Sequence, residues 1–269
     1  MNKLAIVNST LGSLKLKPGL ETELADETLF GMLVNILEED KDWLYVETDY
    51  FYKGYMHKDQ LIIDNIKANK WDEDAKHIIT WGIIDIMKEP KFSSYPIQTL
   101  TRGARIKLSG TKDDRWVEVI FPNGDRGWTR DNFIGTRTEI GTSYDEEILR
   151  NKVIDTAKLY LGTQYRWGGK SQLGIDCSGL SAISYLLNGV VIHRDASITE
   201  GFPVKEILRE QLKPADLLFW KGHVAIYIGN DKYIHSTGAS SGVVINSLNP
   251  KDDDYREDLV DIKQIGSIF

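Results

Sequence analysis

The sequence contains a single cysteine, Cys177, among its 269 residues. One cysteine can form neither an internal disulfide nor a zinc site of several thiolates, which excludes a disulfide-stabilised scaffold. Long hydrophobic runs are also missing, because no apolar stretch approaches the roughly 20 residues that a transmembrane helix needs. At the N-terminus, residues 4–7 are apolar but too few for the core of a secretory signal. We therefore expect no membrane span and a cytoplasmic location; a leader removed from a longer precursor would instead make the protein an exported one.

Positive charge is in short supply. The chain has 33 lysine and arginine residues against 40 aspartate and glutamate residues, which gives a net charge of −7. A nucleic acid or an anionic membrane is therefore not an expected partner. The remaining composition, 41% hydrophobic and 27% charged, is that of a folded chain with room for one large domain or several small ones.

The first half of the chain repeats itself. The stretches "DWLYVETDYFYKGYM" from Asp42 and "RWVEVIFPNGDRGWT" from Arg115 share Trp-x-x-Val and, further on, Gly-aromatic at the same spacing. Within each stretch the side chains alternate with the period of two that is typical of half-buried strands. An Asn-Gly pair in the second stretch is a strong hairpin signal. The sequence therefore predicts two short-stranded β units, residues 1–64 and 71–137, joined by a polar linker or short helix.

The pattern changes in residues 140–269. Ser143 is a predicted helix N-cap, with Glu146 completing a capping box, and the apolar residues that follow recur at helical spacing until Gly162. A second helix is predicted to begin at or next to Cys177, and several short strand-like runs follow it. Helices that precede an antiparallel sheet make this third unit α+β.

The position of Cys177 suits a nucleophile. The N-terminus of a helix carries a partial positive charge and unpaired N–H groups, which favour a thiolate and can hold the oxyanion of an acyl-transfer intermediate. The alternative is that a lone cysteine acts as a small buried hydrophobic residue.

Two histidines are candidates for the base and for the group that orients it. His223 opens the run "HVAIYIG", and His235 lies in the next run, "KYIHST". If "GND" between them is a three-residue loop, Ala225 lies opposite His235, and His223 is diagonal to it on the same face. A two-residue loop would put the histidines on opposite faces. Either they are polar core residues, or they complete the cysteine, base and orienter set of papain-like enzymes.

These motifs resemble a known family. "YRWGG" from Tyr165, "GIDCSG" around Cys177 and the two histidine runs resemble NlpC-type papain-like cysteine peptidases of bacterial cell walls. The resemblance covers about the last half of the chain, and Ala215 stands where the family usually has glycine. The two β units resemble bacterial SH3-like domains, and the whole arrangement resembles γ-D-glutamyl-L-diamino acid endopeptidases of the dipeptidyl-peptidase VI type. The implied fold class is α+β, with two small SH3-like β-barrels before a papain-like peptidase domain.

The resemblance implies roles for the central residues. Cys177 would be the nucleophile, His223 the general base and then acid, and His235 the residue that fixes the tautomer of His223. Tyr165 would point its hydroxyl into the cleft near the reacting carbonyl. Neither a metal nor another cofactor is implied.

The resemblance also implies residues that bind substrate. Asp176 and Ser178 would contact the γ-D-glutamyl part, although aspartate and serine at a helix start also serve as caps. Arg194 would meet a D-Glu carboxylate, and Asp195 would bind the free α-amine of an N-terminal L-Ala. Ala196 stands where relatives often have serine, so one polar contact is missing.

The first β unit would complete the cleft. In the relatives a glutamate from an early loop and a tyrosine after a glycine select a free N-terminus, and these correspond here to Glu23 and Tyr55. Glu27 is the alternative glutamate. Composition alone would make all three ordinary loop residues.

The implied substrates are small peptidoglycan-derived peptides, L-Ala-γ-D-Glu-diamino acid, cleaved after the D-Glu during muropeptide recycling. Both meso-diaminopimelate and L-Lys stay open as the diamino acid, and the sequence predicts no oligomeric state. Two alternatives also stay open: a wall-peptide binding protein with a degenerate peptidase domain, and an amidase or acyltransferase on the same scaffold.

Overall fold

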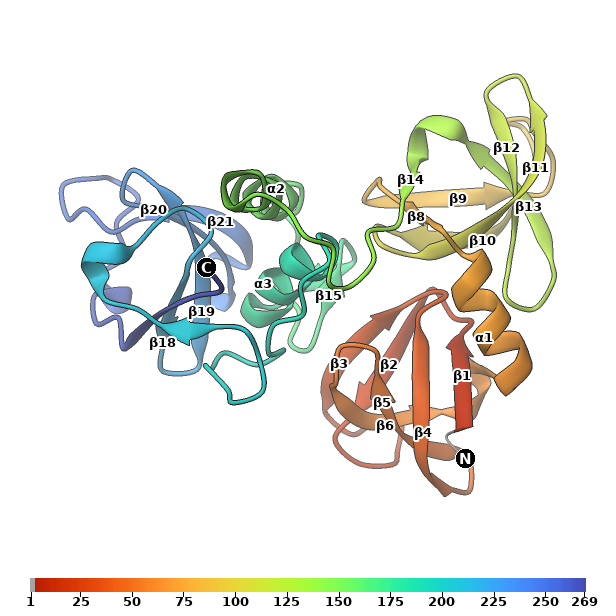
Figure 1. Ribbon diagram of the computed structural model, residues 1–269, viewed down its shortest axis with the longest axis horizontal. Helices are drawn as coiled ribbons and strands as arrows, with labels where there is room; N and C mark the ends of the chain where they lie inside the picture. The colour runs from red at the N-terminus through yellow and green to blue at the C-terminus, as the bar shows by residue number, and fades with distance from the viewer. Residues whose placement is uncertain (1–2) are drawn as a thin grey trace. The chain divides into compact units, whose positions relative to one another are not determined.

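A computed structural model of the chain describes residues 3–269. The chain forms two compact units (Figure 1). The first runs to Arg137 and includes residues 171–173, and the second holds residues 138–170 and 174–269.

The first unit contains two antiparallel sheets of seven strands each. The strands of the first sheet are β1 (Lys3–Val7), β2 (Leu11–Lys15), β3 (Leu24–Leu29), β4 (Leu33–Asp40), β5 (Trp43–Thr48), β6 (Lys53–His57) and β7 (Leu61–Ile63). The strands of the second are β8 (His77–Ile79), β9 (Ile83–Met87), β10 (Pro96–Thr101), β11 (Arg105–Asp113), β12 (Trp116–Ile120), β13 (Arg126–Arg130) and β14 (Ile134–Thr136).

The repeat in the sequence is a repeat in the structure. The strand order is β3-β2-β6-β5-β4-β1-β7 in one sheet and β10-β9-β13-β12-β11-β8-β14 in the other, which is the same order shifted by seven strands. The repeated motif pairs Val46 with Gly54 and Val119 with Gly127. A Cβ atom on Gly127 would lie 2.5 Å from the Ile86 side chain, so the glycine lets a neighbouring strand pass close by.

The polar segment between the sheets forms helix α1 (Asn65–Asp74). The Asp64 side chain caps it by accepting hydrogen bonds from the backbone N–H groups of Ile66 and Lys67. Its Trp71 is buried and donates its indole N–H to the carbonyl oxygen of Gly31 at 2.8 Å. The segment is therefore the short helix of the two predicted forms, and it packs on the first sheet.

The second unit has a six-stranded antiparallel sheet in the order β17-β22-β18-β19-β20-β21, with two helices on one side of it (Figure 1). The strands are β17 (Lys205–Glu206), β18 (Leu217–Trp220), β19 (His223–Gly229), β20 (Lys232–Thr237), β21 (Gly242–Ser247) and β22 (Gln264–Ser267). The helices are α2 (Glu146–Lys158) and α3 (Cys177–Leu186), and short strands β15 (Lys170–Ser171) and β16 (Gly174–Ile175) precede α3. As predicted, the helices come before the sheet in the chain.

Short 3-10 turns connect several elements: η1 (Lys58–Gln60), η2 (Asp131–Phe133), η3 (Arg209–Gln211), η4 (Gly238–Ser240) and η5 (Glu257–Leu259). Within residues 3–269, no helix combines the length and the apolar character needed to cross a membrane.

The predicted start of the first helix of residues 140–269 is wrong by two residues. Asp145, and not Ser143, is the N-cap of α2, and its side chain accepts a hydrogen bond from the backbone N–H of Glu147. Asp145 has the extended ψ of 142° that a cap requires, and Glu146 and Glu147 follow it in the first turn. Ser143 and Asp145 both satisfy the capping rule, so the sequence did not distinguish them.

Ala215 adopts a backbone conformation that disfavours a side chain. Its φ is +73°, in the left-handed region, and it is fully buried immediately before β18. Its backbone is held on both sides: its N–H donates to Tyr227 at 2.7 Å, and its carbonyl accepts from the Tyr185 hydroxyl. The surrounding contacts therefore hold alanine where the family usually has glycine.

We expect Ala215→Gly to be at least as stable as the wild type, because relief of the left-handed strain offsets the lost methyl group and the more flexible unfolded chain. Ala225→Gly is the matched control, since Ala225 is equally buried but lies within β19. This variant should lower the free energy of unfolding by about 1–2 kcal/mol. Urea unfolding measures both, and an equal loss in the two variants would show that Ala215 is not strained.

Candidate active site

Cys177 is the first residue of α3, and Asp176 is the cap before it. One carboxylate oxygen of Asp176 accepts from the backbone N–H of Gly179 at 2.6 Å, and the other accepts from Gly168 at 2.8 Å. Cys177 is 8% exposed. The cysteine therefore lies at the N-terminus of a helix, as predicted, with its neighbour joining that helix to the loop before it.

Glycines let the preceding loop press against the start of α3. A Cβ atom on Gly179 would lie 2.2 Å from the carbonyl oxygen of Gly169, and one on Gly169 would lie 2.4 Å from that of Gly174. No side chain fits at such backbone distances. The glycine cluster around the cysteine therefore serves close packing of backbone on backbone.

Arg194 is buried beside the same carboxylate, with only 2% of its surface exposed. Its two terminal nitrogens lie 3.1 Å from the two oxygens of Asp176, and one of them also donates to the Ser178 hydroxyl at 2.7 Å. A bidentate arginine–carboxylate pair is strong and directional. Asp176 thus caps α3 and pairs with Arg194. This ion pair holds the chain around Arg194 at the start of the helix.

The two histidines share a face of the sheet, and their rings are hydrogen bonded, with His223 Nε2 2.7 Å from His235 Nδ1. Ile226 pairs with Ile234 across β19 and β20, a register that continues to Ala225 opposite His235. His223 is two residues further along, so it is diagonal to His235 as predicted.

The connection that produces this register is not the predicted three-residue loop. It is a two-residue turn, Asn230 and Asp231, with φ of 52° and 57°, as a type I′ turn requires. A register shift between Tyr227 and Gly229 adds the missing residue within β19. The bulge therefore restores the face that a two-residue turn alone would have reversed.

Asn246 in β21 extends the hydrogen-bonded pair of His223 and His235. Its side-chain oxygen lies 2.9 Å from His235 Nε2, and its amide nitrogen donates to the carbonyl oxygen of Asp254 at 2.7 Å. Sequence reasoning missed Asn246. The signal was a polar residue directly after the apolar run of residues 243–245, but its alignment with His235 depends on the β20–β21 register, in which Val244 lies opposite His235.

Burial sets the charge state of the site. Burial, with a smaller contribution from His235, lowers the pKa of His223 to about 3. Burial likewise lowers the pKa of His235 to about 4, against a smaller opposing effect of its hydrogen bond to Asn246. Burial and then the Asp176 charge raise the pKa of the Cys177 thiol, although the backbone N–H groups of Val224 and Ser178 hydrogen bond to it. At neutral pH the site therefore contains a thiol and two neutral imidazoles.

Tyr165 lies near the thiol and is partly buried. Burial, followed by the charges of Cys177 and Asp176, raises the pKa of Tyr165 to about 12. Its hydroxyl is therefore neutral at pH 7 and can donate a hydrogen bond.

A small cavity of about 10 Å³, enough for about one water molecule, lies beside the first turns of α3, and Cys177 itself does not line it. Its polar wall includes Ser178 and Ser181 of α3 together with Asp195 and Ser197, and Val224 of β19 closes another side. Asp195 is exposed, so its carboxylate faces solvent near the helix that carries Cys177. Ser197 places a hydroxyl in this wall, one residue after Ala196.

The residues predicted to close the cleft lie in the first unit. Glu23 is exposed directly before β3, whereas Glu27 is 4% exposed within β3. Tyr55 lies in β6 opposite Tyr45, with ring centres 4.9 Å apart. Across residues 3–269, no three histidine, cysteine or acidic side chains gather as metal ligands would.

Residues 162–258 match the model of the NlpC/P60 family. Dipeptidyl-peptidase 6 of Lysinibacillus sphaericus is 42% identical over 270 residues, which cover 98% of this chain and 99% of that protein. Gamma-D-glutamyl-L-lysine dipeptidyl-peptidase of Bacillus cereus (strain ATCC 10987 / NRS 248) is 30% identical over 247 residues, which cover 84% of this chain and 71% of that protein.

Among solved structures, an NlpC/P60 family protein from Bacillus cereus ATCC 10987 matches with a TM-score of 0.80 over 97% of this chain and 98% of that one. Its sequence is 23% identical, so this likeness shows a shared fold. The near-full-length identity to Dipeptidyl-peptidase 6 goes further and confirms the predicted resemblance: the chain belongs to the NlpC/P60 family and is a cysteine peptidase.

Proposed function

We propose that the protein hydrolyses the bond between γ-D-Glu and the diamino acid in peptidoglycan-derived peptides that carry a free N-terminal L-Ala. The observation that carries the proposal is Cys177 at the start of α3 together with the hydrogen-bonded His223 and His235. The names of the two relatives support the choice of bond, since one is a γ-D-glutamyl-L-lysine dipeptidyl-peptidase and the other Dipeptidyl-peptidase 6.

In the proposed reaction, His223 removes the proton of the Cys177 thiol as the sulfur attacks the carbonyl carbon. Backbone N–H groups at the start of α3 hold the resulting oxyanion, and the neutral Tyr165 hydroxyl donates to it. Protonated His223 then gives its proton to the departing amine, and water hydrolyses the thioester. His235 keeps the His223 ring oriented throughout.

Binding of the peptide is assigned to the surface around the start of α3. We place the α-amine of L-Ala at the Asp195 carboxylate and the γ-D-glutamyl part along the wall that contains Ser178. The hydrogen bonds of Asp176 and Arg194 to each other support a role for both in holding this wall in place. Any contact of these two residues with substrate remains a prediction.

We further propose that the two sheets of the first unit are SH3-like domains, supported by their identical strand order and their repeated valine–glycine pair. Selection of a free N-terminus by Glu23 and Tyr55, with Glu27 as the alternative glutamate, stays a prediction. A carboxylate at the amine would favour an ammonium group and penalise an acylated terminus. Muropeptide recycling in the cytoplasm stays the prediction for its cellular role, and export the alternative.

The first test is mass spectrometry of L-Ala-γ-D-Glu-L-Lys, and of its meso-diaminopimelate counterpart, incubated with wild type and with Cys177→Ala. We expect the wild type to release L-Ala-γ-D-Glu, because its thiol and base are intact. The variant should be slower by about a thousandfold or more, since the nucleophile is gone.

Cleavage of the L-Ala–D-Glu bond instead would contradict the proposed choice of bond. Binding of both peptides without cleavage of either would favour the wall-peptide binding protein.

The second test concerns the amine. Asp195→Asn should lower kcat/KM for the free peptide by about 10-fold to 100-fold, the size of a lost charge-assisted hydrogen bond. The N-acetylated peptide should be a poor substrate of both proteins. Glu23→Gln and Glu27→Gln, measured in parallel, identify which glutamate contributes, and Glu210→Gln at the exposed turn η3 is the control. Equal cleavage of free and acetylated peptides by the wild type would contradict the amine clamp.

The third test concerns the neutral histidines. The unfolded chain takes up protons on His223 and His235 as the pH falls below 6.5. In the folded protein the pKa of His223 is about 3 and that of His235 is about 4, so both rings stay neutral to a lower pH. The stability that these groups contribute is therefore complete above pH 6.5 and is lost as the pH falls towards 4. When the pH is lowered from 7.5 to 5.0, the free energy of unfolding of His223→Gln should fall by about 2 kcal/mol less than that of the wild type. Urea unfolding at the two pH values measures this difference.

An equal acid loss in His223→Gln and wild type would mean that His223 is not held neutral by the fold.

A further inference from the structure

Asn246 occupies a place in the site that the proposed reaction does not yet use. It is buried, and it lies between His235 and the carbonyl oxygen of Asp254. An asparagine amide has one end that only donates and one that only accepts, so its orientation decides which proton its neighbours carry.

The orientation of the amide is set by the backbone. The Asp254 carbonyl can only accept, and it receives hydrogen bonds from the backbone N–H of Ser247 at 3.2 Å and from the Asn246 amide nitrogen at 2.7 Å. The amide NH₂ must therefore face Asp254, which leaves the amide oxygen facing His235.

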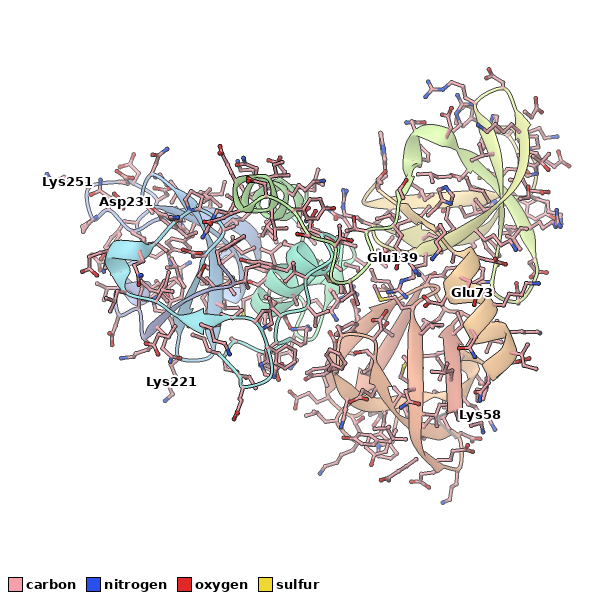
Figure 2. All side chains as sticks on the ribbon, viewed as in Figure 1. Lys58, Glu73, Glu139, Lys221, Asp231 and Lys251 are labelled. Carbon is pink, nitrogen blue, oxygen red and sulfur yellow. The ribbon has the colours of Figure 1, made fainter. Side chains whose placement is uncertain are left out.

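The loop that contains Asp254 is fixed in turn. Lys232 in β20 lies 2.8 Å from both the Asp252 and the Asp254 carboxylates. The backbone N–H of Leu248 donates to Asp231 in the β19–β20 turn at 2.7 Å. Figure 2 labels Asp231 in the turn and Lys251 in the loop, which lie at the same end of the second unit in this view. The loop that carries the Asp254 acceptor is thus tied to β20 and to the β19–β20 turn.

The orientation of the Asn246 amide determines which ring nitrogens of His235 and His223 carry protons. His235 Nε2 must carry a proton to donate to the Asn246 oxygen, so the Nδ1 of the neutral ring is an acceptor. His223 Nε2, 2.7 Å away, must then donate to it. A neutral imidazole carries one such proton, so His223 Nδ1 is left with its lone pair.

We propose that Asn246 is a positioning residue that, through His235, keeps the proton of His223 on Nε2 and leaves Nδ1 as the base for Cys177. Asn246 does this without touching substrate or thiol. This inference rests on the proposed function, because it assumes that His223 is the base.

Other charged groups near the two rings are balanced. Arg256 and Asp258 both act on the two imidazoles, in opposite directions, and they are paired with each other at 2.6 Å. Tyr233 contributes its ring against His235, with centroids 5.0 Å apart. The Asn246 amide is therefore the group that sets the direction of the hydrogen bonds.

The test is Asn246→Asp, which keeps an acceptor but adds a negative charge beside His235. The charge should keep a second proton on His235, whose Nδ1–H then donates to His223 Nε2 and moves the His223 proton to Nδ1. Two readouts need no peptide: the ¹⁵N NMR shifts of the imidazoles, and the rate of Cys177 alkylation by iodoacetamide across pH. Cys177 is the single cysteine, so intact mass reports its alkylation alone.

In the wild type we expect both rings to carry the proton on Nε2 at pH 7.5. In Asn246→Asp we expect His223 to carry it on Nδ1 and alkylation to be about 10-fold slower at pH 7, an effect the size of one misplaced hydrogen bond. The rate should recover at higher pH, where His235 loses its extra proton. Asn151→Asp is the matched control, because it makes the same change at an exposed position of α2 and should leave both readouts unchanged.

Wild-type tautomers and alkylation rates in Asn246→Asp would overturn the proposal. An alkylation rate that falls equally at every pH, with unchanged tautomers, would also overturn the proposal, because it would indicate a merely structural role. If Asn246→Asp does not fold, Asn246→Ala should instead give a mixture of His235 tautomers, and a single wild-type tautomer there would overturn the proposal as well. Failure to cleave the peptide, with both readouts as expected, would reject the proposed substrate and leave this inference standing.

Discussion

The buried carboxylate of Asp176 is the constraint on which the rest of the site depends. It joins three segments: the preceding loop at Gly168, the first turn of α3 at Gly179, and the buried Arg194, which is 18 residues further along the chain. A buried charge that loses its partner costs several kcal/mol, so each segment fixes the others. Cys177 is the next residue, and the position of its sulfur is therefore set by this ion pair.

That arrangement has an electrostatic consequence. The Asp176 charge and burial both raise the pKa of the Cys177 thiol, against the N–H groups at the helix start. The site thus holds the sulfur firmly but does not favour a resting thiolate. Burial also keeps His223 neutral, so it is available to take the proton. Both features follow from exclusion of water, and together they favour proton transfer during the attack over a preformed ion pair.

The sequence predicted those parts of the site that follow from local patterns. Cys177 at a helix start and His223 diagonal to His235 required only helical spacing and strand alternation. The parts it missed depend on non-local geometry. The β19 bulge and the two-residue turn compensate each other, so the right face was predicted from a wrong loop. Asn246 became visible only through the β20–β21 register, and Asp145 competed with equally good caps nearby.

The repeated β units show the difference between a packing motif and a functional one. Val46 with Gly54 and Val119 with Gly127 are equivalent pairs in two sheets of the same order, so the shared residues account for the fold. Whatever distinguishes the two units must lie where the repeats differ. The residue after the glycine is one such place: it is Tyr55 in the first unit and Trp128 in the second. The fold accommodates either tyrosine or tryptophan at this position, so ligand binding can determine which of them occurs there. The shared glycine is required for packing and is not open to such a choice.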